Sequence, residues 1–325
     1  MNAFSFACTA CGKCCNSPPA MSLPELFRHR DRFIGCIAIG RVPRRHMGER
    51  IRVGQHEAVL DEADSAAFES IAGTLLHRAG DTFSIMTQGY DYPSLARCPA
   101  LAEDGRCAIH LNGKPLMCEV VPLDPLVPDR LQHLVLAGRN QSASYIGADC
   151  IQEGERADAT LMIAQGEIKD AKAREALARR RHDLEREHEV WGRAVFESLR
   201  KDLFESPAAL ARIPPGGFLT ISIVPALLAV AGISARCRQL CLDYIDSQLA
   251  LIDRSIEQAL SRRRLEDRPV TQELRGFAQA YQRAKALLAA PLRTPLPIPL
   301  PAVEPEIGTP SSLSNTEAYL SGADH

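Results

Sequence analysis

Apolar residues recur at helical spacing in two segments of the N-terminal half. Residues 61–77 place alanine, phenylalanine, isoleucine and leucine on one face behind an acidic start, which predicts a helix whose first turn suits the helix dipole. Residues 22–33 begin with Ser22, followed by a proline in the first turn and by Glu25 three positions later. This order predicts a short helix with a capping box at its N-terminus.

The same periodicity is stronger in the C-terminal half. Residues 157–205 contain strong helix formers and Glu/Arg pairs three and four positions apart, so they predict one or two long helices. Residues 233–265 and 270–290 repeat this pattern on either side of Arg268 and Pro269. Together these segments predict a helical bundle or an array of helical hairpins.

The N-terminal half is otherwise rich in glycine and proline and weakly periodic, and only loops and short strands are expected between residues 78 and 150. The predicted fold class is therefore mainly α, with an irregular cysteine-rich N-terminal module and a helical C-terminal domain. The expected boundaries are a cysteine-cluster domain at 1–153, a helical domain at 154–290 and a disordered proline-rich tail at 291–325.

The longest apolar run, GFLTISIVPALLAVAGISA at residues 217–235, approaches the length of a membrane span. It contains Thr220, Ser222 and a central Pro225, and no second run of this kind accompanies it. We expect it to be buried in protein and expect no contact with a membrane.

Charge excludes several classes of partner. The 325 residues include 38 basic and 40 acidic side chains, a formal net charge of -2, so no overall field attracts nucleic acid or an anionic membrane. The first residues lack the charge and the apolar run of a secretory signal, and the expected location is a reducing cytoplasm. The expected partners are a protein partner or a protein substrate, bound through the helical half.

Cysteine carries the clearest chemical signal. Nine of the eleven cysteines lie in the first 150 residues, and in a reducing compartment such a group indicates metal binding or catalysis more than disulfides. The first group, CTACGKCC, contains Cys8, Cys11, Cys14 and Cys15. Two-residue spacing lets successive sulfurs turn toward one centre, while the adjacent pair indicates two neighbouring centres or one ligand and a spare thiol.

A second group contains Cys98, Cys107 and Cys118, with Cys150 as a fourth member. Eight thiolates suffice for two four-coordinate metal sites, or for one polynuclear cluster with shared ligands. These eight cysteines are the candidate metal ligands.

The motifs occur in the order C-x2-C-x2-CC, C-P-x-L, G-x-C-x-I-H, P-x2-C-x3-P and a later cysteine. Their positions are residues 8–15, Cys98 to Leu101, Gly105 to His110, Pro115 to Pro122, and Cys150. This order resembles the CxxCxxCC cysteine-cluster family, whose members are described as chelating zinc or iron. Lys114 and His110 stand where that family usually has arginine and tyrosine. The resemblance covers about the first 150 residues and implies a bound metal.

Thiolates suit both an iron–sulfur cluster and zinc, and the tripled spacing favours the cluster slightly. The metal would either hold together a half that lacks periodic core elements or support catalytic or redox chemistry. The resemblance also extends to a flagellin lysine N-methylase, which implies a protein-modifying enzyme that uses S-adenosylmethionine as an alternative. A thiol redox switch at Cys14 and Cys15 is a second alternative. Neither a G-x-G-x-x-G motif nor a P-loop appears, and no catalytic or cofactor-binding residue is assigned.

The remaining cysteines have simpler interpretations. Cys36 lies in an apolar run, and Cys237 and Cys241 lie four positions apart on a predicted helix, so all three are expected to pack in the core. His110, between two candidate ligands, is expected to support the site or to lie at the surface.

Overall fold

The computed structural model describes residues 3–8, 13–111, 113–141, 150–290 and 310–321. The chain forms two compact units. The first consists of Met1–Pro19, Pro43–Leu76 and Ala100–Glu185, and the second of Ala20–Val42, His77–Pro99 and Arg186–His325. Each unit therefore gathers segments that are far apart in the sequence.

The first unit combines antiparallel strands with helices. Its elements are β1 (Phe4–Phe6), a 3-10 turn (Lys13–Cys15), β3 (Arg50–Val53), β4 (His56–Val59), α2 (Glu62–Leu75), α3 (Leu116–Val120), a 3-10 turn (Asp129–Leu131), α4 (Gln132–Gln141), β7 (Ile151–Glu153), β8 (Thr160–Ala164), β9 (Glu167–Ile168) and α5 (Ala171–Glu187). The last two residues of α5, Arg186 and Glu187, belong to the second unit. Four strands form a sheet in the order β7-β1-β8-β9, and β3 and β4 form a separate hairpin.

The core of the first unit is built from the inner side chains of this sheet and from the helices. Phe4, Ile151 and Ile163 of the strands are fully buried, and they cluster with Leu136 of α4 and Leu177 of α5. Burying such side chains contributes about 1.5–3 kcal/mol each. The first unit therefore has a hydrophobic core of its own.

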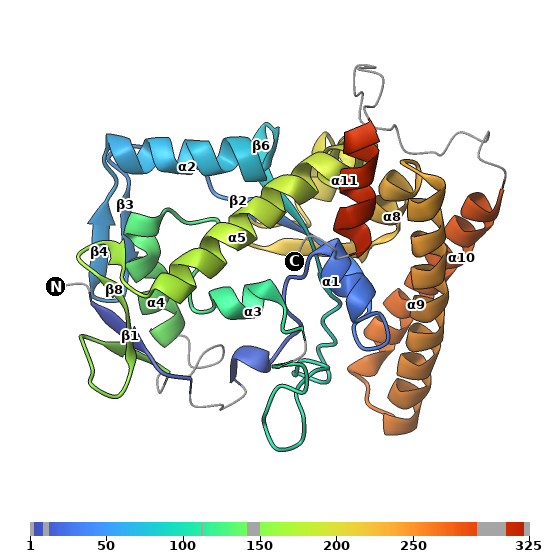
Figure 1. Ribbon diagram of the computed structural model, residues 1–325, viewed down its shortest axis with the longest axis horizontal. Coiled ribbons are helices and arrows are strands. Elements are labelled where there is room, and N and C mark those ends of the chain that lie inside the picture. The colour runs from blue at the N-terminus through green and yellow to red at the C-terminus, as the bar shows by residue number, and fades with distance from the viewer. Residues whose placement is uncertain (1–2, 9–12, 112, 142–149, 291–309, 322–325) are drawn as a thin grey trace. The chain divides into compact units, whose positions relative to one another are not determined.

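The second unit contains a four-stranded antiparallel sheet and most of the long helices (Figure 1). Its elements are α1 (Leu23–Arg28), β2 (Gly35–Val42), β5 (His77–Ala79), β6 (Asp81–Gly89), a π-helical turn (His188–Gly192), α6 (Arg193–Leu199), a second π-helical turn (Arg200–Phe204), α7 (Pro207–Leu210), β10 (Phe218–Ser222), α8 (Val224–Ala231), α9 (Ala235–Arg262), α10 (Asp267–Ala289) and α11 (Pro310–Ser321). The strand order is β10-β2-β6-β5, and α9 and α10 run side by side as a hairpin.

The start of β2 is tied to this hairpin. Gln248 of α9 is fully buried; its Nε2 donates to the carbonyls of Arg30 and Phe33 at 2.8 and 3.1 Å, and its Oε1 accepts from the N–H of Gly35 at 2.8 Å. A Cβ at Gly35 would lie 2.2 Å from the hydroxyl oxygen of Tyr244, so only glycine allows this approach. The Gln248 side chain thus satisfies three backbone groups at the place where the helical hairpin contacts the start of β2.

The predicted capping box at Ser22 is confirmed, and the helix predicted from its acidic start at Asp61 has a capping box as well. Ser22 accepts from the N–H of Glu25 while the Glu25 carboxylate accepts from the N–H of Ser22, and Asp61 and Asp64 do the same at the start of α2. The predicted helices at 233–265 and 270–290 correspond to α9 and α10, which are separated by Arg263 in the left-handed region.

The predicted fold class is wrong. The chain is 51% helix and 17% strand, and antiparallel sheets organise the half that was expected to be irregular. The strands of the first unit are two to five residues long, too short to show the alternation that identifies a strand. Within the predicted helical segment 157–205, β8 and β9 precede α5.

The apolar run at 217–235 divides into strand β10 and helix α8, and the buried side chains of α8 include Leu227, Leu228 and Val230. Among the described residues, no helix is long and apolar enough to cross a membrane. Of the predicted tail, residues 310–321 form α11, while residues 291–309 and 322–325 lie outside the described part of the chain.

Replacing Gln248 by leucine should lower the free energy of unfolding by about 3 kcal/mol, because three buried backbone groups lose their partners. Gln239 is exposed on the same helix, so Gln239→Leu is the matched control and should change stability by less than about 0.5 kcal/mol. Urea unfolding followed by circular dichroism measures both variants. Equal losses would contradict the role assigned to Gln248.

A buried histidine, His77, and a half-buried one, His188, make the second unit sensitive to acid. The ring of His77 stacks on those of His188 and Phe196, with centroids 4.3 and 4.8 Å apart. Burial lowers the pKa of His77 to about 3, with added repulsion from His188 and Arg193, and burial together with Arg193 lowers the pKa of His188 to about 4.

Unfolded histidine titrates near pH 6.5, so below that pH the unfolded state binds more protons than the folded state. The stability is therefore full above pH 6.5 and falls as the pH drops toward the folded pKa values. We expect His77 to account for a loss of about 1 kcal/mol between pH 7 and pH 5.5. Urea unfolding at both pH values should show a smaller loss for His77→Phe, whereas the exposed control His110→Phe should keep the wild-type loss.

Candidate functional site

The first cysteine group lies at the end of the strand β1. The backbone N–H of Ala7 donates to the carbonyl of Cys150 at 2.9 Å, which continues the pairing of β1 with β7 by one residue. Cys8 follows directly and is exposed, whereas Cys150 is only 5% exposed and belongs to the core of the first unit. The sheet therefore brings these two segments together.

Cys14 and Cys15 lie in the 3-10 turn that follows. Their sulfur atoms are 4.0 Å apart. Two sulfurs bound to one tetrahedral zinc ion at about 2.3 Å each are about 3.8 Å apart. The sequence predicts that the adjacent cysteines serve two centres or leave one thiol spare. Their separation also allows a third arrangement, in which both sulfurs contact one ion. Cys11 lies outside the described residues.

The electrostatics of this pair oppose ionisation in the absence of a cation. The pKa of the Cys14 thiol is raised well above its usual range by its hydrogen bond to Cys15, by partial burial and by the repulsion of a second thiolate. The ammonium group of Lys114 acts in the opposite direction. Lys114 precedes Cys118 by four residues, so the segment that carries Cys118 lies within electrostatic reach of the first group.

The second cysteine group is anchored by short pieces of regular structure. Cys107 pairs with Leu101 in an isolated antiparallel bridge. Cys118 lies in α3, whose Leu116 and Val120 pack in the same buried cluster as Cys150. The first unit thus gathers the segments of the first group, of Cys118 and of Cys150.

Cys98 is 7% exposed and belongs to the second unit. No disulfide joins any two of the ten cysteines that the structure describes. Among the described residues, no three cysteine, histidine, aspartate or glutamate side chains are grouped closely enough to hold a metal ion. Thiolates suit a soft metal, and the Cys14 and Cys15 sulfurs are spaced as two ligands of one ion would be. Of the eight candidate ligands, Cys11 is the one whose position is not described.

The three other cysteines pack in the core, as predicted. Cys36, Cys237 and Cys241 are fully buried in the second unit. The thiol of Cys36 donates to the carbonyl of Gln88 and that of Cys241 to the carbonyl of Leu227, both at 3.5 Å. Burial raises the pKa of the Cys36 and Cys241 thiols well above the usual range. His110 is exposed.

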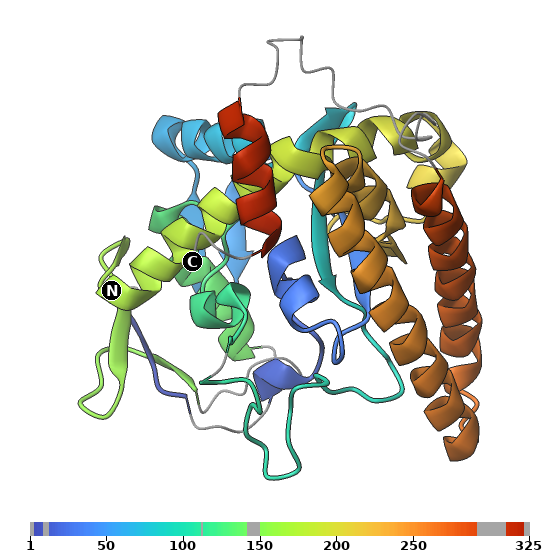
Figure 2. The same ribbon diagram turned by 45° about the vertical axis from the view of Figure 1, so that its right-hand side comes forward.

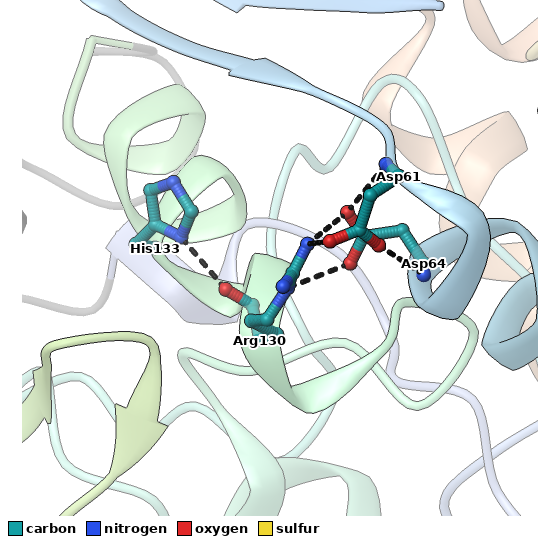
Figure 3. A network of polar contacts seen from close by, with 4 residues as sticks. All are labelled: Asp61, Asp64, Arg130 and His133. Atoms are coloured by element: carbon teal, nitrogen blue, oxygen red, sulfur yellow. Dashed lines mark hydrogen bonds and ion pairs between the residues drawn. The ribbon is translucent and has the colours of Figure 1, made fainter. Parts of the chain in front are cut away.

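A polar network in the first unit was not predicted (Figure 3). Arg130 Nε donates to Asp64 at 2.8 Å and its Nη2 to Asp61 at 2.6 Å, and both carboxylates also form the capping box of α2. The N–H of Asp64, followed by Arg130, holds the pKa of Asp61 below its usual value. The acidic start of α2 is visible in the sequence, but its pairing with Arg130 is not.

His133 extends this network beside a cavity of about 300 Å³, lined also by Glu57, Asp64 and Arg130. Nδ1 of His133 lies 3.0 Å from the carbonyl oxygen of Arg130 and donates to it in the neutral ring. Burial lowers the pKa of His133, which favours that neutral form. The network clamps the start of α2 to the start of α4, with one guanidinium held between two carboxylates.

Thiol labelling should separate the two classes of cysteine. In metal-free native protein we expect iodoacetamide to modify the exposed Cys8 first, and Cys36, Cys237 and Cys241 only after unfolding, because burial denies access and suppresses the thiolate. Peptide mass spectrometry after timed labelling measures each rate. Rapid labelling of Cys36 or Cys241 in native protein would contradict their assignment to the core.

Comparisons of this chain with protein-family models, with curated proteins and with solved structures give no match. The resemblance to the CxxCxxCC cysteine-cluster family consequently depends on the motifs alone and stays a prediction.

Proposed function

We propose that this protein binds a metal centre through cysteine thiolates, with an iron–sulfur cluster as the first candidate and zinc as the second. The proposed ligands are those that the sequence indicates: Cys8, Cys11, Cys14, Cys15, Cys98, Cys107, Cys118 and Cys150. The observation that carries the proposal is the 4.0 Å separation of the Cys14 and Cys15 sulfurs.

Two thiols at this distance favour a cation for an electrostatic reason. The pKa of Cys14 is raised by its hydrogen bond to Cys15, by burial and, in addition, by the mutual repulsion of two thiolates. A metal ion between them converts that repulsion into two attractive bonds, and thiolate is the form in which cysteine binds metal. The distance is also well beyond the about 2.05 Å of a disulfide, so the two sulfurs are not bonded to each other.

The surrounding residues support this use of the pair. Lys114 places positive charge near thiolates whose complexes with zinc or with a cluster carry net negative charge. Cys150 is buried and Cys8 is exposed, so the donor set extends from the core to the surface of the first unit. A bound cluster would supply electron transfer at this place, and zinc a closed structural site.

The proposal includes a reducing compartment such as the cytoplasm, since free thiols persist there. It also includes a protein partner or a protein substrate, recognised by the helices of the C-terminal half. The net charge of -2 supports neither nucleic acid nor an anionic membrane as a partner.

Anaerobic purification followed by elemental analysis tests the metal directly. We expect iron and acid-labile sulfide with a brown chromophore, and we expect Cys14→Ser combined with Cys15→Ser to lower the metal content at least tenfold. Cys36→Ala is the matched control, because Cys36 is a core thiol, and it should retain the metal.

Each other outcome has a definite meaning. Colourless protein with stoichiometric zinc would select the second candidate metal, and wild-type protein with neither metal would contradict the proposal. Calorimetric titration with S-adenosylmethionine addresses the methylase alternative, which predicts binding. Reversible oxidation of Cys14 and Cys15 in metal-free protein addresses the redox-switch alternative.

A further inference from the structure

The C-terminal helix α11 packs against α1 and α9 of the second unit (Figure 2). Tyr319 and Leu320, in its last turn, are each only 3% exposed. The helix has twelve residues, which is at the lower limit for a helix that is stable alone in water. Its order therefore depends on the surface that it contacts.

That surface recognises tyrosine in two ways. The guanidinium carbon of Arg186 lies 4.6 Å from the centroid of the Tyr319 ring, a cation–π contact. The hydroxyl of Tyr319 donates to Oε1 of Glu187 at 3.3 Å in a buried setting. Phenylalanine would retain the first contact and lose the second.

A second contact fixes the direction of the helix. The hydroxyl of Ser234 donates to Oε1 of Glu317 at 2.5 Å, two residues before Tyr319. The same Ser234 oxygen accepts from the N–H of Cys237 at 3.1 Å and so caps the N-terminus of α9. An acidic residue at this end of α9 also lies near the positive pole of the helix dipole.

The surface does not depend on α11 for its own structure. Oε1 of Glu187 also accepts from the N–H of Leu23 at 3.0 Å and from the hydroxyl of Thr87 at 3.2 Å. Because these bonds lie within the second unit, they hold the carboxylate in place whether or not Tyr319 is bound. The cap that Ser234 provides to α9 is likewise independent of Glu317. We call Arg186, Glu187, Ser234 and the adjoining faces of α1 and α9 the α11 dock.

The connection to the rest of the chain is long. Residues 290–309 separate the end of α10 from the start of α11, and they contain six prolines. Covalent attachment keeps a released helix at a high local concentration, so weak docking suffices for occupancy in the intact chain. The helix α11 is marginally stable alone, its binding surface is held in place without it, and the connection is long. These three features suit a helix that binds the rest of its own chain reversibly.

We propose that α11 is a tethered ligand of the α11 dock, which is a binding surface for a helix that presents tyrosine two residues after an acidic residue. The chain's own α11 is the occupant of the dock, and it leaves the dock reversibly while the second unit stays folded. This inference is independent of the proposed metal centre, because every contact named here lies within the second unit.

The test uses the full chain with a protease recognition sequence inserted after Pro301, cleaved and separated from its C-terminal fragment. A fluorescein-labelled peptide of residues 308–325 is then titrated and followed by fluorescence anisotropy. We expect saturable binding to the cleaved chain and at least tenfold weaker binding to the intact chain, whose dock is occupied. The Tyr319→Phe peptide should bind about tenfold more weakly because one hydrogen bond to a carboxylate is lost.

The Ser321→Ala peptide is the control, because Ser321 is exposed and bonds only within its own helix in the described structure. It should bind like the native peptide. Absence of binding to the cleaved chain, equal binding to the intact chain, or equal binding of the Tyr319→Phe peptide would overturn the proposal.

A second measurement avoids cleavage altogether. In full-length protein, Tyr319→Ala should speed amide hydrogen exchange in residues 316–321 while α9 stays protected. Unchanged exchange in α11 would count against the dock. A dimer of the intact chain that the peptide dissociates would assign the occupant to a second copy and overturn the intramolecular assignment.

Discussion

The first unit depends on the pairing of one strand of three residues. β1 lies between β7 and β8 and is hydrogen-bonded to both of them. β7 and β8 are neighbours in the sequence, whereas β1 lies far from both at the start of the chain. A shift of one residue would turn Phe4 out of the core and move the start of the cysteine loop. The burial of Phe4 therefore determines the register, and the register determines where Cys8 leaves the sheet beside Cys150.

The strands show which parts of the fold cannot be predicted from short stretches of sequence. The capping box at Ser22 and the acidic start of α2 at Asp61 act within four residues, and both helix starts were predicted correctly. β2 was missed because its first five residues are all buried and show no alternation, and β10 because it adjoins α8 in one apolar run. β2 acquires its identity from β6 and β10, which are far away in the sequence, and no local pattern encodes that pairing.

The same distinction applies to the candidate site. The thiols themselves are visible as spacing, since Cys14 and Cys15 need only a turn to bring their sulfurs to 4.0 Å. The approach of the first group to the segments of Cys118 and Cys150 is not visible, because it requires the β1–β7 pairing and the packing of α3 on the same core. The clamp between Asp64 and Arg130 was missed for the same reason, as one partner caps a helix and the other begins a later one.

The core of the first unit also bears on what a metal would do there. A structural role was attractive while this half was expected to lack periodic core elements. The first unit instead buries Phe4, Ile151 and Ile163 completely, and its sheet is hydrogen-bonded without the help of a thiol. Small domains that cannot fold without zinc have little such core. Since burial and backbone pairing supply the cohesion, the proposed metal centre would serve its own chemistry rather than hold the chain together.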